Sequence, residues 1–113
     1  HLMTTLIIVY CAVLLIILAA YWKIFEKAGK PGWAGIVPIY NIFVYLEIIN
    51  RPWWWFIMLL IPFVNIYFGI VMVHRLSRSF GKDVGFTIGL LLLGFIFVPI
   101  LGFGDAKYTA LKD

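Results

Sequence analysis

Long apolar runs alternate with short charged clusters along the sequence. A helix that crosses a bilayer needs about 20 mostly apolar residues, and four runs approach that length. Each run is apolar on all sides and lacks the period-two alternation of a barrel strand, so the runs are predicted to be helices. The sequence therefore predicts an all-α membrane protein, a bundle of about four transmembrane helices over residues 4–22, 31–49, 53–73 and 86–103.

The distribution of Lys and Arg predicts how these helices are oriented. Short connections make neighbouring helices antiparallel. Six of the nine basic residues lie in the first and third connections, 23–30 and 74–85, and the others lie in the turn 50–52 and after residue 103. Cytoplasmic loops carry an excess of Lys and Arg, so the first and third connections are predicted to be cytoplasmic. Both termini would then be extracytoplasmic, in a multi-pass protein of the cell membrane.

Composition supports the membrane class. The chain is 65% hydrophobic and 12% charged, with a mean hydropathy of +1.06. A soluble domain of this length could not bury so much apolar surface, so one integral membrane domain over 3–113 is predicted, with the lipid bilayer as partner. Residues 1–2, before Met3, are interpreted as a cloning remnant. The net charge of +4 is scattered in clusters, which suits anionic lipid and not the continuous basic face that nucleic acid requires.

Two apolar segments share a Pro-x-x-Asn pattern, Pro38 to Asn41 and Pro62 to Asn65. Each proline deprives a helical carbonyl of its donor, and transporters use such interrupted helices to bind ions and substrates. The spacing predicts that the two Asn side chains lie at similar depth on adjacent helices. The favoured interpretation is a clamp that fixes helix pairing, and the alternative is a ligand or ion site. Pro99, followed by glycine in place of Asn, is interpreted as a third, degenerate copy.

Glu47 is the only acidic residue inside a predicted span. A carboxylate within a membrane is expensive and is by default a functional hypothesis. Arg51 lies four residues later, so the favoured interpretation is an ion pair along one helix face near the outer boundary. A proton or cation site is the alternative. The segment 31–49 is also short, so a re-entrant or interfacial helix stays open, and that arrangement would change the topology.

The sequence offers no catalytic or metal-binding constellation. His74 is the only histidine outside the first two residues, and Cys11 is the only cysteine. Neither has partners at ligand spacing, so no metal and no cofactor is predicted.

Several motifs resemble a family of small bacterial and archaeal membrane proteins of unknown function, whose members are often labelled signal peptidase I automatically. They are Lys30-Pro-Gly-Trp33, Pro38-Ile-Tyr-Asn41, Pro62-Phe-Val-Asn65, Ser79-Phe-Gly-Lys82 and Leu101-Gly-Phe-Gly-Asp105. The resemblance covers about residues 21–108. It implies a multi-helix membrane protein and supplies no established activity.

The residues do not support the peptidase label. A signal peptidase of that type resembles a Ser/Lys dyad enzyme with a large β-domain, for which this chain has no room. The only serines, Ser77 and Ser79, lie in a basic connection, and Lys82 beside them is solvated there, whereas a catalytic lysine must be desolvated.

Three functions follow, in decreasing order of support. The first is a non-enzymatic helix bundle that oligomerises or binds a membrane partner or lipid. The second is a small oligomeric channel or transporter with a polar site at Asn41, Asn65 and Glu47. The third is an intramembrane enzyme, which is disfavoured because no nucleophile–base pair is present.

Overall fold

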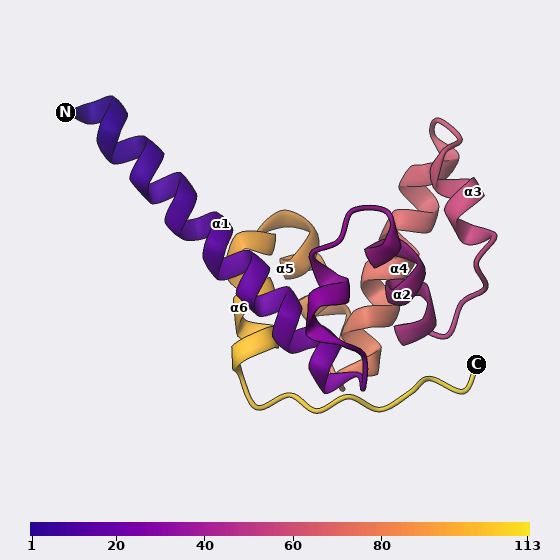
Figure 1. The fold of residues 1–113 in the computed structure, drawn as a ribbon. Helices are drawn as coiled ribbons and strands as arrows, with labels where there is room; N and C mark the ends of the chain where they lie inside the picture. The colour runs from indigo at the N-terminus through magenta and orange to yellow at the C-terminus, as the bar shows by residue number, and fades with distance from the viewer.

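The computed structural model describes residues 1–113 and contains helices without any strand, which confirms the all-α prediction. One long helix stands out from a group of shorter ones (Figure 1). In chain order the elements are α1 (Leu2–Lys27), the 3-10 helix η1 (Gly32–Gly35), α2 (Tyr40–Ile48), α3 (Trp55–Leu59), α4 (Val64–Ser79), α5 (Val84–Leu92) and α6 (Gly94–Phe103).

Helix α1 is the one helix that is long and apolar enough to cross a membrane. Its 26 residues rise about 39 Å. It contains the predicted first span, 4–22, and its C-terminal half packs against η1 and α6. The helix ends where Gly29 adopts a φ of +80° and the Lys30 N–H donates to the Phe25 carbonyl at 2.9 Å, a cap that glycine favours.

The prediction of a straight helix over 31–49 is wrong, because the chain reverses at Pro38. η1 leads to the turn and α2 leads back, so Lys30 and Glu47 form an ion pair at 2.7 Å. A straight helix would hold these two residues about 25 Å apart. Ile39 adopts a φ of +69°, and the next N–H donates to the Pro38 carbonyl at 2.7 Å in a γ-turn. The segment is thus a hairpin, the shape that the re-entrant alternative requires.

The predicted helix 53–73 is a second hairpin, made of α3 and α4. Its turn repeats the first, since Phe63 adopts a φ of +68° and the following N–H donates to the Pro62 carbonyl at 2.8 Å. The rings of Trp55 and Phe68 meet edge to face with centroids 4.8 Å apart, although a straight helix would separate these residues by about 20 Å. Both proline-containing motifs therefore reverse the chain.

The predicted helix 86–103 is a third hairpin, in which α5 and α6 are joined at Leu93. The rings of Phe86 and Phe97 lie 5.2 Å apart. Pro99, interpreted from the sequence as another interruption, instead lies inside α6. A single proline removes one backbone donor, and apolar helices of membrane proteins tolerate such a loss.

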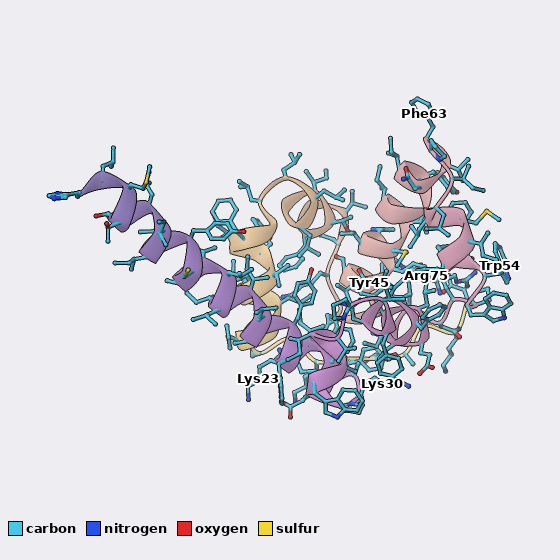
Figure 2. All side chains as sticks on the ribbon, turned by 45° about the horizontal axis from the view of Figure 1, so that its top comes forward. Lys23, Lys30, Tyr45, Trp54, Phe63 and Arg75 are labelled. Carbon is cyan, nitrogen blue, oxygen red and sulfur yellow. The ribbon has the colours of Figure 1, made fainter.

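All three hairpins begin and end at one end of the molecule, which we call the base (residues 27–31, 48–53, 79–84 and 104–113). The hairpin turns point away from the base, as Figure 2 shows for Phe63, which lies far from Lys23 and Lys30. We call these turns the tips. They expose large apolar side chains: Ile39 is 61% exposed, Phe63 85% and Leu92 75%.

The base gathers helix C-termini. Helices α1, α2 and α4 all end there in the same cap, with Gly29, Asn50 and Gly81 at φ values of +80°, +58° and +74°. A helix C-terminus carries partial negative charge and unpaired carbonyls, so cations are stabilising beside it. Lys27 shows this, because its Nζ donates to the Leu101 carbonyl at 2.8 Å at the end of α6.

The extended segment 104–113 crosses the base and ties its helix ends together (Figure 1). The Tyr108 hydroxyl donates to the Ile48 carbonyl at 2.6 Å, which caps α2. The Thr109 N–H donates to the Ser79 carbonyl at 2.7 Å, at the end of α4. We call this segment the strap.

Candidate functional site

The best-formed cavity has a volume of about 350 Å³ and lies between α1 and the first two hairpins. Eight of its ten lining residues are hydrophobic. Small-molecule sites are typically about 300–1,000 Å³, mostly apolar, with a few polar groups. The lining residues are Ile17, Leu18, Tyr21, Phe25, Gly35, Asn41, Ile42, Tyr45, Leu59 and Met72.

The polar groups of the cavity are neutral and partly engaged. Asn41 extends from the first turn of α2, and its Nδ2 donates to the Gly35 carbonyl at 3.4 Å, so its amide oxygen has no protein donor. Tyr45, one turn later, donates its hydroxyl to the Met72 carbonyl on α4 at 3.2 Å. No charged side chain lines the cavity. This lining suits an apolar chain or ring with one hydrogen-bonding group and disfavours an ion.

Asn65 takes no part in this site. It lies exposed in the first turn of α4 and makes no side-chain hydrogen bond. The Asn41–Asn65 clamp expected from the sequence is therefore not formed. The physical reason is the hairpin geometry: each motif turns at its own tip, so the two Asn side chains lie on different hairpins, and of the two only Asn41 lines the cavity.

Glu47 and Arg51 are likewise separated. The carboxylate of Glu47 pairs with Lys30 across the first hairpin, in place of the expected partner four residues along. Arg51 lies beyond the cap of α2, where the helical spacing no longer applies, and its guanidinium lies 5.6 Å from the centroid of the Trp55 ring. Asn41, Glu47 and Asn65 therefore do not line one path within a single copy of the chain.

A cluster of arginines at the base was not singled out in the sequence. Arg75 and Arg78, three residues apart on α4, face the side-chain carboxylate of Asp113, and Arg51 donates to the main-chain oxygen of the same residue. Because Arg78 donates a hydrogen bond to it, the Asp113 carboxyl has a pKa below its usual value. The i, i+3 spacing of the two α4 arginines was the available sequence signal, hidden because both were counted as part of a loop.

The serines and His74 are engaged in hydrogen bonds within the fold. Ser77 donates to the Asp83 carbonyl at 3.1 Å and Ser79 to the Arg75 carbonyl at 2.8 Å. Both serines are fully buried. His74 lies 2.9 Å from the Thr87 hydroxyl, between α4 and α5. No group of three His, Cys, Asp or Glu side chains converges.

The comparisons with known proteins agree with the resemblance noted in the sequence to a family of unknown function. No curated protein and no solved structure matches the chain. The sequence model of one family matches residues 33–110, more than two thirds of the chain, including all three hairpins except the first residue of η1. The chain therefore belongs to the family of unknown function DUF5684.

Proposed function

We propose that this chain is a non-enzymatic, lipid-binding membrane module in which one helix crosses the bilayer and three hairpins enter a single leaflet. The contacts that bring both ends of each hairpin to the base carry this proposal, above all the 2.7 Å pair of Lys30 with Glu47. If the hairpins crossed the membrane, those ends would lie on opposite sides.

Helix lengths support this arrangement. The hydrocarbon core of a bilayer is about 30 Å thick, and α1 exceeds that length at about 39 Å. Helices α2, α5 and α6 have 9, 9 and 10 residues, so each rises only about 14–15 Å, half of the core. Helix α4 has 16 residues, but its apolar part before Arg75, residues 64–74, rises only about 16 Å. Their apolar tips would therefore end near the bilayer midplane.

The distribution of charge fits the same picture. All nine Lys and Arg and all five Asp and Glu residues lie in segments 23–30, 47–51, 75–83 and 105–113, at or next to the base. The apolar tips carry none. The excess of Lys and Arg orients the base toward the cytoplasm and its anionic lipids. The start of α1 would then be extracytoplasmic, whereas the four-span alternative places both termini there.

Cysteine labelling tests the topology. In a Cys11→Ala background, Glu26→Cys, Trp53→Cys and Lys107→Cys would each be treated with a membrane-impermeant maleimide in right-side-out and inside-out vesicles. We expect all three to react from one side, because all three lie at or beside the base. Leu2→Cys is the control for the opposite side, and Phe63→Cys should react only after detergent is added. If Glu26→Cys reacts from one side and the other two from the opposite side, the four-span bundle is correct and the hairpin proposal fails.

The cavity supports the lipid-binding part of the proposal, since its apolar lining and single free amide oxygen match an acyl chain with a polar end. Native mass spectrometry from detergent would report retained lipid and subunit number. Ile42→Trp narrows the cavity and should reduce the lipid adduct, whereas Ile66→Trp, on an exposed face of α4, should not. Equal adducts on both variants would refute lipid binding in this cavity. The predicted homo-oligomer is tested by the same spectra.

A further inference from the structure

Three guanidinium groups converge at the base, between the end of α2 and the last turns of α4. Arg75 is the deepest of them, only 7% exposed, and its Nε donates to the Ile49 carbonyl at 2.9 Å. Figure 2 shows this residue within the α2–α4 region, well below the tip at Phe63. Arg78 follows on the same helix face, and Arg51 approaches from the connection that follows α2.

The cluster has more donors than the protein satisfies. The Nη2 atom of Arg75 and the Nε atom of Arg51 are buried without a hydrogen-bond partner. A buried donor left unpaired is costly, and more so on a charged group. Such orphaned donors in a well-packed region point to an acceptor that the chain itself does not supply.

Asp113 is the only carboxylate paired with these arginines, and it fills the cluster incompletely. Its Oδ2 accepts from Arg78 at 3.1 Å, its Oδ1 lies 3.9 Å from Arg75 Nη1, and its main-chain oxygen accepts from Arg51. One carboxylate thus faces two guanidinium groups, and the third contacts only the main chain of the same residue. Asp113 lies on the exposed strap, so its removal would not disturb the hydrophobic core.

We propose that Arg51, Arg75 and Arg78 form a binding site for a phosphate group, which Asp113 occupies in its absence. Arginine presents a planar fork of donors that matches phosphate oxygens, and a phosphate monoester offers three terminal oxygens where a carboxylate offers two. The phosphate has two sources, the headgroup of an acidic phospholipid or soluble phosphate. The inference rests on the side-chain geometry and holds whichever way the hairpins lie in a membrane.

The test is calorimetric titration of the full chain in detergent with three probes: inorganic phosphate, dihexanoyl phosphatidic acid and dihexanoyl phosphatidylcholine. We expect binding of phosphate and of phosphatidic acid and weaker binding of phosphatidylcholine. Equal affinity for the first two identifies soluble phosphate as sufficient, whereas tighter binding of phosphatidic acid identifies the lipid headgroup. Both results support the site, and absence of binding by both overturns it.

Two variants at the site and one matched control make the test specific. Asp113→Asn removes the competing negative charge from the site and should tighten phosphate binding several-fold, whereas Asp105→Asn removes the same charge elsewhere on the strap and should not. Arg78→Gln, on a partly exposed residue, should weaken binding by about tenfold. The Asp113→Asn result stands even if Arg78→Gln fails to fold. Equal gains from the two Asp→Asn variants, or unchanged binding by a folded Arg78→Gln variant, would show only general charge attraction and overturn the proposal.

Discussion

Replacing Phe63 with glycine should stabilise this protein, which is the opposite of what the same change does in a helix. Phe63 lies at the tip of the second hairpin with a φ of +68°, in the left-handed region that bulky side chains avoid. Glycine adopts that conformation without steric cost. Phe63 is also 85% exposed, so its side chain contributes little packing that the substitution could remove.

The magnitude follows from two opposing contributions. A residue with a Cβ pays about 1–3 kcal/mol to hold this strained γ-turn conformation, and glycine recovers that cost. Against this gain, glycine lowers the free energy of unfolding by about 0.5–1 kcal/mol, because it makes the unfolded chain more flexible. We therefore expect a net gain of about 1 kcal/mol in the free energy of unfolding. In a continuous helix over the same residues, the change would instead cost about 0.5 kcal/mol.

The sign of this change in the free energy of unfolding is measurable by titrating the purified protein with SDS in mixed micelles and monitoring unfolding by circular dichroism. Ile66→Gly is the matched control, since Ile66 is also large and exposed but has helical backbone in α4, and it should lower stability by about 0.5 kcal/mol. Ile39→Gly should behave like Phe63→Gly, because its turn has the same hydrogen-bond pattern. If Phe63→Gly destabilises as much as the control does, the γ-turn at the tip is refuted.

Three further predictions concern the packing of α1 and the strap. Gly102→Val should lower the SDS midpoint far more than Gly94→Ala, because a Cβ at Gly102 would lie 2.5 Å from the Ala20 carbonyl oxygen whereas Gly94 faces open space. Tyr108→Phe should cost about 1 kcal/mol by the same titration, through loss of its hydrogen bond to Ile48. Docking of the strap, measured by limited proteolysis, should be unchanged from pH 7 to 5. Docking should then weaken as the pH falls below about 4. The pKa of the Asp113 carboxyl is lowered, so the carboxylate holds the arginines until it is protonated. Weakening near pH 6 would contradict this assignment.

The sequence shows the apolar runs clearly, but not how each run folds. A run of 19 apolar residues satisfies the pattern of one spanning helix and equally that of two short helices joined at a tip. The prolines at positions 38 and 62 mark the interruptions. What they leave open is the conformation of the next residue, and Ile39 and Phe63 are types that sequence rules exclude from a positive φ.

Local spacing rules also fail where the hairpins bring distant residues together. Glu47 was paired by spacing with Arg51, yet its partner Lys30 lies 17 positions away and is reached only because the first hairpin closes. Asn41 was identified from its motif and does line the cavity. Tyr45 was missed, since nothing in the sequence indicates that its hydroxyl meets the Met72 carbonyl on another hairpin.

The confinement of charge to the base has a consequence for biogenesis. A spanning second segment would require Glu47 or Arg51 to be carried through the hydrocarbon during insertion, and each such residue costs about 2.5–3.5 kcal/mol at the centre of a membrane helix. A hairpin that enters and leaves by the same face carries no charge across. In the proposed arrangement, the rest of the chain would partition from the cytoplasmic side after α1 is inserted, driven by its apolar tips. Its insertion would then need no translocation step and would be insensitive to the membrane potential.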